Sequence, residues 1–202
     1  MILCIDTCTP YAGIALIDKS DCHYKSLPKG QYGESVIPFI EAVLEKAKVK
    51  PKDLTGILVI RGPGSFTGLR VGIAIANQFA HQLKIPIIGL RTEEWWAHRT
   101  KESNFLYLQS MNRDEVYNGE RIIPLVDMLN QIRSDHWKWM GDLSAEHRKK
   151  LPATFKEITK LNPPKKTWYT VAHYIDWQME KNYALIEPYY GKEPTITKGK
   201  KR

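Results

Sequence analysis

Hydrophobic residues in the first half of the chain recur alternately with the spacing of strands and the spacing of helices. This pattern predicts strands at 2–6, 12–18, 56–60, 85–90 and 104–110, and helices at 35–48, 68–83 and 92–101. We place the start of the first helix near Ser35, because Pro38 is tolerated only in the first turn of a helix. The run at 56–60 has no polar alternation, so both of its faces should be buried.

The pattern weakens beyond Tyr117. It predicts a strand at 114–117 that pairs with 104–110, a helix at 123–132, a strand at 136–140, a loop at 160–166 and an amphipathic helix at 168–182. No internal sequence repeat is visible. Alternating strands and helices indicate an α/β fold in which helices cover a mixed sheet.

Length and composition narrow the class of protein. The chain has 202 residues, of which 43% are hydrophobic, enough for one large domain or two small ones. No apolar run approaches the roughly 20 residues that span a bilayer, and the first residues do not form a signal peptide. The three cysteines are an odd number, which favours reduced thiols. We therefore expect a cytoplasmic protein without a membrane segment.

Half of the net charge of +8 lies at the C-terminus. Residues 192–202, KEPTITKGKKR, carry five Lys or Arg and one Glu. Such a tail is typical of a solvated chain end, and it is also suited to contact RNA phosphates. The sequence leaves both interpretations open.

The segment RGPGSFTGLRVG, 61–72, joins a predicted strand to a predicted helix. Its glycines allow either a phosphate-binding loop or a tight turn on which the helix packs closely, and we expect Gly64 to adopt a positive φ. The segment lacks the Gly-Lys-Ser/Thr ending of a P-loop. The candidate loop residues are Gly62, Pro63, Gly64, Ser65, Phe66, Thr67 and Gly68.

The helix after this loop is apolar around most of its circumference, so it should be buried on several sides. Small residues recur every four positions along one side, which permits another helix to approach closely. A neighbouring helix or a partner protein must then cover it. With the first helix, the candidate interface residues are Val36, Phe39, Ile40, Val43, Leu69, Val71, Gly72, Ile75, Ala76, Phe79 and Ala80.

Candidates for catalysis are few. Asp6 ends the first strand, where an acid could hold a hydrated Mg²⁺ beside a nucleotide, but the following turn, TCTPY, has no glycine. The carboxylate could instead accept hydrogen bonds from that turn. The six histidines include no pair four residues apart, and no Cys/His group has zinc spacing. We predict no catalytic residue and no metal site.

Long stretches of the chain resemble one family. ILCIDTCTPYAGIALID, ESVIPFIEAVL and GILVIRGPGSFTGLRVGIAIANQFAHQLKIPIIGLRT are similar to the bacterial TsaB (YeaZ) family over about residues 1–92. MNRDEVYNGE and EPYYGKE resemble later family segments more weakly. The resemblance implies the ASKHA fold of actin, sugar kinases and Hsp70, with two related α/β lobes, the second one reduced. We expect lobes at 1–92 and 93–191 and a tail at 192–202.

The resemblance also implies a function. It implies a non-catalytic subunit that pairs with the transferase TsaD in forming N6-threonylcarbamoyladenosine at position 37 of ANN-reading tRNAs, with TsaE as an ATPase that joins them. The helices near 35–48 and 68–83 would form a four-helix bundle with the partner, or with a second copy when the chain is isolated. The tRNA would be reached through the complex, with no cofactor on this chain and ATP or ADP only at a shared interface.

The first of the following three features excludes a metal-dependent transferase, and the other two depart from the family pattern. TsaD carries a His-x-x-x-His metal site after the corresponding strand, whereas this chain reads GLRTEEWWAH. The family's His near the first helix is absent from QYGESVIP, and the region after Glu120 is short. Two alternatives remain, an ATP-dependent ASKHA phosphotransferase that uses Asp6 and the 62–68 loop, and an RNA-binding module that uses the tail.

Overall fold

The computed structural model describes residues 1–28, 32–132, 137–177 and 185–192. Its first lobe contains β1 (Ile2–Asp6), β2 (Gly13–Ile17), β3 (Cys22–Ser26), α1 (Tyr32–Ala47), a 3-10 turn (Pro51–Asp53), β4 (Gly56–Gly62), α2 (Phe66–Leu83) and β5 (Ile87–Arg91). The sheet order is β3-β2-β1-β4-β5. β1, β2 and β3 are antiparallel neighbours, whereas β4 and β5 continue the sheet in parallel from β1.

The second lobe repeats this topology with shorter elements. It contains β6 (Leu106–Ser110), β7 (Glu115–Tyr117), β8 (Ile122–Pro124), α4 (Leu125–Gln131), β9 (Lys138–Asp142), α5 (Ala145–Lys150) and β10 (Lys156–Glu157). The sheet order, β8-β7-β6-β9-β10, has the same pattern of antiparallel and parallel pairs as the first sheet. The expectation of two related lobes with a reduced second one is thereby confirmed.

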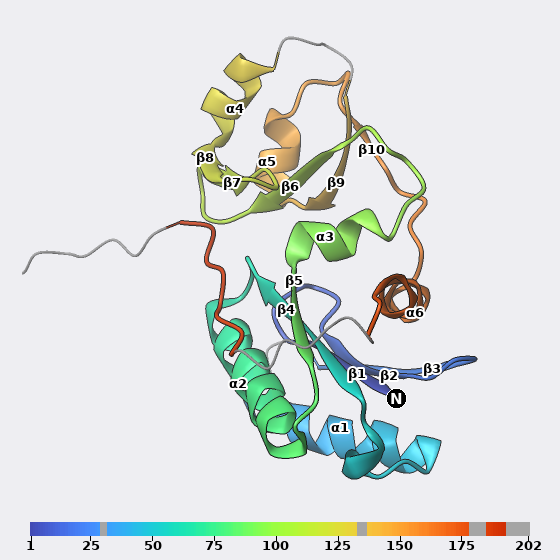
Figure 1. Cartoon of the computed structure of the whole chain (residues 1–202). Coiled ribbons are helices and arrows are strands. Elements are labelled where there is room, and N and C mark those ends of the chain that lie inside the picture. The colour runs from blue at the N-terminus through green and yellow to red at the C-terminus, as the bar shows by residue number, and fades with distance from the viewer. Residues whose placement is uncertain (29–31, 133–136, 178–184, 193–202) are drawn as a thin grey trace, which may run out of the picture.

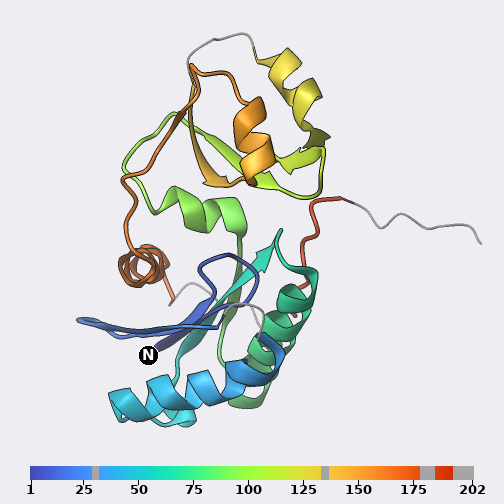
Figure 2. The ribbon, with the colours of Figure 1, turned by 180° about the vertical axis from the view of Figure 1, so that it is seen from behind.

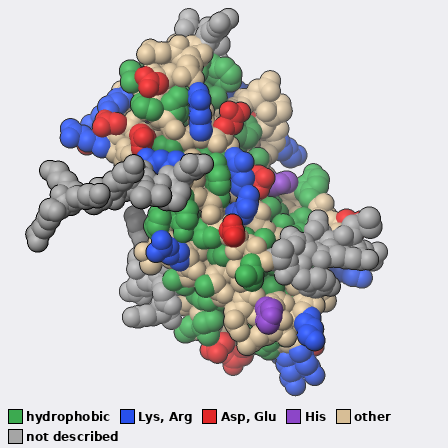
Figure 3. Space-filling view, turned by 60° about the vertical axis from the view of Figure 1, so that its left-hand side comes forward, with side chains coloured by type: hydrophobic (Ala, Val, Ile, Leu, Met, Phe, Trp, Pro, Cys, Tyr) green, Lys and Arg blue, Asp and Glu red, His purple; other side chains and the backbone are tan. Residues whose placement is uncertain are grey.

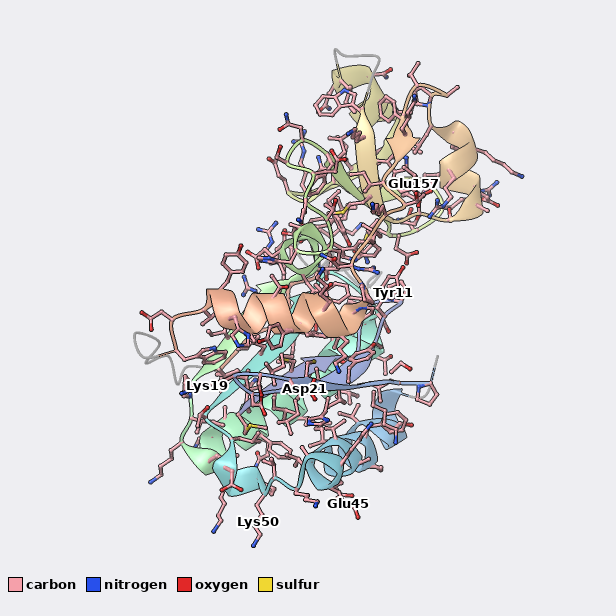
Figure 4. The ribbon with its side chains drawn as sticks, turned by 90° about the vertical axis from the view of Figure 1, so that its right-hand side faces the viewer. Tyr11, Lys19, Asp21, Glu45, Lys50 and Glu157 are labelled. Carbon is pink, nitrogen blue, oxygen red and sulfur yellow. The ribbon has the colours of Figure 1, made fainter. Side chains whose placement is uncertain are left out.

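Helices cover both faces of the first sheet (Figures 1 and 2). α1 and α2 contact each other on one face, α1 over β2 and β3 and α2 over β4. On the other face, α6 (Pro164–Tyr174) crosses β2 and β3. Figure 4 shows α6 above the β2–β3 turn, where Lys165 pairs with Asp21 and the Tyr169 hydroxyl donates to the Lys19 carbonyl oxygen.

Large aromatic side chains fill the space between the two sheets. α3 (Thr92–Ala97) contacts β4, β5 and β9 from this position. The Trp95 ring lies 5.8 Å from that of Trp168 on α6, and both side chains are fully buried. One hydrophobic core therefore runs from the first lobe through α3 and α6 into β6, β7 and β9, and a smaller core lies within the second lobe.

Most predicted elements are confirmed, with several corrections. α1 begins at Tyr32 rather than near Ser35, so Pro38 lies inside the helix, on its exposed side, and not in the first turn. α2 begins at Phe66 and α3 ends at Ala97. The start of the predicted helix at 123–132 is strand β8.

Two other elements, β3 and α5, were not predicted from the hydrophobic pattern. β3 is an edge strand with polar residues on both faces, and α5 is a six-residue polar helix, so neither shows a hydrophobic period. α6 begins at Pro164, where a proline suits the first turn, and ends at Tyr174. The predicted helix at 168–182 is therefore wrong at 175–177, which are not helical, and 178–182 lie outside the described residues.

Trp168→Ala should lower the free energy of unfolding by about 3–5 kcal/mol, because it removes a fully buried indole from the junction of α3 and α6. Tyr174→Ala is the matched control on α6, since that ring is 76% exposed and its loss should cost about 0.5 kcal/mol or less. Urea denaturation measures both. Equal effects would show that the aromatic junction does not hold α6.

Candidate functional site

The glycine-rich loop joins β4 to α2 through a tight turn. Gly62 adopts φ +111°, a backbone conformation that favours glycine, and the Ser65 hydroxyl accepts a hydrogen bond from the Gly68 N–H at 3.3 Å. The positive φ expected at Gly64 is therefore found at Gly62 instead. The serine caps an 18-residue helix.

The loop packs directly on the β1–β2 turn. The Ser65 N–H donates to the Cys8 carbonyl oxygen at 3.0 Å, and the Thr7 hydroxyl donates to the Gly68 carbonyl oxygen at 2.6 Å. A methyl group at Gly64 would lie 2.6 Å from the Cys8 carbonyl oxygen, and one at Gly68 would overlap the Thr7 carbonyl oxygen. The glycines permit this close approach, which favours the tight-turn interpretation over a phosphate loop.

The same loop is tied to two further elements. The Pro63 carbonyl oxygen accepts a hydrogen bond from the Thr92 hydroxyl of α3 at 2.7 Å and one from the Gln109 amide of β6 at 3.4 Å. The loop is thus fixed against the β1–β2 turn, α3 and the second lobe together.

Asp6 is fully buried beneath this contact. Its carboxylate accepts hydrogen bonds from the Cys8 N–H at 2.9 Å, the Thr9 N–H at 3.0 Å and the Thr9 hydroxyl. Burial raises the pKa of Asp6, opposed by these hydrogen bonds. The carboxylate stabilises its own turn and has no exposed surface for a nucleotide contact.

Ser110 occupies the equivalent strand end in the second lobe. Its hydroxyl accepts the Ser144 N–H at 2.8 Å and lies 2.7 Å from His147 Nδ1, while His147 Nε2 lies 2.9 Å from the Arg113 carbonyl oxygen. A proton on Nε2 satisfies that carbonyl and leaves Nδ1 to accept from Ser110. Because His147 is fully buried, the pair is closed to a substrate and joins β6 to α5.

The Arg99 side chain is buried between the two lobes, near the β1–β2 turn. Its guanidinium lies 3.9 Å from the centre of the Tyr11 ring and 4.7 Å from that of Trp96, and the residue is only 4% exposed. Figure 4 places Tyr11 near one end of α6, at the boundary between the lobes. Stacking of this kind stabilises a cation in a water-poor setting.

The predicted interface residues divide into two groups. Those buried within the chain itself are Val36, Ile40, Val43, Leu69, Gly72, Ala76 and Ala80. The close approach permitted by the small residues is made inside the molecule, since a methyl group at Gly72 would overlap the Thr7 hydroxyl. The members that reach the surface are Phe39, Val71, Ile75 and Phe79, and Ile37 adds a side chain that is 41% exposed.

Within the described residues, no group of three His, Cys, Asp or Glu side chains is arranged to hold a metal ion. In the same part of the chain, no helix is both long and apolar enough to cross a membrane.

Several known proteins are similar to this chain in sequence. The family model described as "TsaD: tRNA N6-adenosine threonylcarbamoyltransferase" matches residues 28–136. A protein of Buchnera aphidicola (from Schizaphis graminum) is 30% identical over 85% of this chain and 77% of its own length. Its name is tRNA threonylcarbamoyladenosine biosynthesis protein TsaB. The chain belongs to the TsaB (YeaZ) family.

Further relatives agree with this TsaB assignment. The Bacillus subtilis protein of the same name is 33% identical over 65% of this chain and 66% of its own length. A Pseudomonas aeruginosa structure described as similar to peptidase YEAZ has a TM-score of 0.74 at 18% identity and covers 95% of this chain and 99% of its own. Another, described as YeaZ from the same organism, has a TM-score of 0.68 at 19% identity. These structures show the shared fold.

Sequence reasoning missed the role of the segment after α6, residues 185–192, which we call the C-terminal strap. The Asn77 side chain exchanges two hydrogen bonds, both 2.9 Å, with the Ile186 backbone, and the Tyr189 N–H donates to the Arg61 carbonyl oxygen at 2.7 Å. The Tyr189 hydroxyl then donates to the Glu120 carbonyl oxygen of the second lobe. The only sequence signal was the weak family likeness of EPYYGKE.

Gly64→Ala should lower the free energy of unfolding by about 1–3 kcal/mol, because the new methyl group meets the Cys8 backbone and Cβ at 2.6–2.9 Å. Thr67→Ala, an exposed change in the same loop, should cost no more than about 0.5 kcal/mol. Urea denaturation compares the two variants. A Gly64→Ala protein as stable as wild type would contradict the close packing.

Asp6→Asn should change how stability depends on pH. Because the folded-state pKa of Asp6 is raised above its ordinary value of 3.8, ionisation costs stability as pH rises through that window. The asparagine variant should therefore gain stability relative to wild type as pH rises above the ordinary pKa of the carboxyl, measured by urea denaturation.

The control is Asp18→Asn, since hydrogen bonds from Ser20 and Asp21 lower the pKa of that exposed carboxyl. Its stabilising effect is fully present above the ordinary pKa and is lost only as pH falls below it, so this variant should be less stable than wild type by a constant amount from about pH 5 upward. Parallel profiles for the two variants would contradict the burial effect at Asp6.

Proposed function

We propose that this chain is a non-catalytic subunit of the machinery that forms N6-threonylcarbamoyladenosine in tRNA, where it pairs with a TsaD-like transferase. Membership in the TsaB family supports a role in this modification, because the relatives are named as its biosynthesis proteins. The expected position 37 of ANN-reading tRNAs follows from the family resemblance.

The observation that carries the proposed pairing is the outer surface of α1 and α2. Both helices present apolar side chains that the chain only partly covers, among them Phe39, Val71, Ile75 and Phe79. α2 contains no Asp or Glu, and Arg70 is its only Lys or Arg. Depletion of charge around aromatic and aliphatic side chains is typical of the core of a protein interface. Figure 3 shows hydrophobic side chains gathered on the side of the molecule where α2 lies.

The closed candidate sites support a scaffold role rather than a chemical one. The Asp6 carboxylate is saturated by its own turn, and the glycine-rich loop uses its Ser65 N–H on Cys8. Both groups on which an ASKHA phosphotransferase would depend are therefore engaged in packing, and this observation disfavours that alternative.

The wider assembly follows from the same proposal. A TsaE-like ATPase joins the pair, tRNA is bound through the complex, and any ATP or ADP lies at a shared interface. Without its partner, the apolar surface of α1 and α2 pairs with a second copy, because an exposed apolar patch can match itself about a two-fold axis.

Ile75→Arg tests this interface. The side chain is partly exposed, so the variant should fold, but an arginine in the centre of the apolar surface should abolish co-purification with the TsaD-like protein and self-association. Circular dichroism, sedimentation velocity and co-purification from the native cell measure the three properties.

Two variants serve as controls. Ala76→Arg places the charge one residue further, where exposure is 0%, and should unfold the chain. Val126→Arg changes a residue of α4 that is 64% exposed and should leave folding and binding intact. If Ile75→Arg folds and still binds its partner like wild type, this surface is not the interface.

A further inference from the structure

The C-terminal strap lies along the edge of the boundary between the lobes that is opposite α6. Figure 1 shows it running from α2 toward β7 and β8, with α6 on the other side of the molecule. On the first lobe, the Asn77 side chain of α2 holds the Ile186 backbone, and the Tyr189 N–H donates to the Arg61 carbonyl oxygen in β4. The strap is therefore anchored to the first lobe at two points.

Three contacts then join the strap to the second lobe. The Tyr189 hydroxyl donates to the Glu120 carbonyl oxygen at 3.2 Å, and the Tyr189 ring centre lies 6.1 Å from that of Tyr117. Lys192 pairs with Glu115 of β7 at 3.1 Å. Tyr189 thus bonds to both lobes, through its N–H to the first and through its hydroxyl to the second.

Two glycines of the first lobe leave room for the strap. A methyl group at Gly62 would lie 2.2 Å from the Tyr189 carbonyl oxygen, and one at Gly89 of β5 would lie 2.8 Å from the Ile186 side chain. Glycine within a strand often marks a place where another backbone approaches closely. The first lobe is therefore shaped to receive the strap.

Arg91, at the end of β5, also crosses the boundary between the lobes, and Tyr189 packs against it. The Arg91 guanidinium donates to the Tyr117 hydroxyl at 2.6 Å and to the Gly119 carbonyl oxygen, both in the second lobe. The same guanidinium lies 4.9 Å from the centre of the Tyr189 ring. Hydrogen bonds are stronger where water is excluded, so the ring should strengthen these bonds between the lobes.

The place that the strap occupies is one that commonly binds ligands in other folds. Arg61 and Arg91 lie at the carboxyl ends of the parallel strands β4 and β5. Open α/β sheets bind their ligands in the crevice outside the carboxyl ends of such strands. Here a segment of the chain itself, with Tyr189 at its centre, takes that position.

The two edges of the boundary differ in burial. At the α6 edge, Trp95 and Trp168 are fully buried, whereas every residue of the strap is at least partly exposed. Segments with few buried contacts open at the lowest cost in free energy. We propose that the strap is a releasable clasp, which holds the lobes together when docked and lets them open about the α3–α6 junction when released. This conformational role is independent of the proposed function.

The test measures the distance between the lobes in the full chain. Spin labels on Glu45→Cys in α1 and Val126→Cys in α4, two exposed sites, report this distance by double electron–electron resonance. The three native cysteines are buried, and burial raises the pKa of each thiol, so they should take up no label. The parent protein that carries only the two labels should give one narrow distance distribution.

Two variants release the clasp from opposite ends. Tyr189→Ala removes the contacts of that side chain with the second lobe, and Asn77→Ala frees Ile186 from α2 without touching the second lobe. Each should raise the ratio of molecules at a longer distance to those at the parent distance about fivefold, the effect of losing a hydrogen bond. The combined variant should raise this ratio more than either change alone.

Gln78→Ala is the matched control, because Gln78 is an exposed neighbour of Asn77 on α2. This variant should keep the parent distance distribution. Circular dichroism checks that every variant is folded, and the single variants carry the test if the combined one is not.

Two results would overturn the proposal. If the folded strap variants keep the parent distribution, the α3–α6 junction and Arg91 hold the lobes without the strap. If only Tyr189→Ala lengthens the distance, the ring of Tyr189 acts alone and the anchored strap is not a clasp.

Discussion

The contact between the glycine-rich loop and the β1–β2 turn determines most of the molecule's properties. The Ser65 N–H donates to the Cys8 carbonyl oxygen and the Thr7 hydroxyl donates to the Gly68 carbonyl oxygen, at a distance that leaves no room for a side chain at Gly64. This contact packs α2 on the first sheet and buries the Asp6 side chain. The face of α2 that carries small residues is consequently used inside the chain, and its partly exposed apolar face is left for another molecule.

The second lobe also has a glycine in close contact with a neighbouring backbone and a serine that caps the following helix. Gly141, in β9, has φ +137°, and a methyl group there would overlap the Leu108 carbonyl oxygen, while Ser144 caps α5 as Ser65 caps α2. At the strand end where the first lobe has Asp6, the second has Ser110 bonded to the buried His147. In both lobes the strand end is engaged by its own loop, which fits a subunit that contributes surfaces to a complex.

The long elements of the first lobe were predictable because each shows a clear hydrophobic period, and the loop was predictable because its glycines are distinctive. Whether Asp6 binds a ligand or its own turn depends on three donors whose positions no pattern reveals. The small residues of α2 indicated close packing correctly, but a sequence cannot say whether the packed surface is internal, as at Ala76. Hydrophobic periodicity could not predict the strap, because residues 185–192 form neither helix nor strand.

The central claim is that packing, rather than ligand binding, occupies the loop and Asp6. The most direct test is to measure Mg²⁺–ATP binding by calorimetry and ATP hydrolysis by the purified chain, in the absence of any partner. The predicted result is neither binding nor turnover above the buffer control. Saturable binding or steady hydrolysis that disappears in Asp6→Ala, while that variant stays folded, would contradict the account.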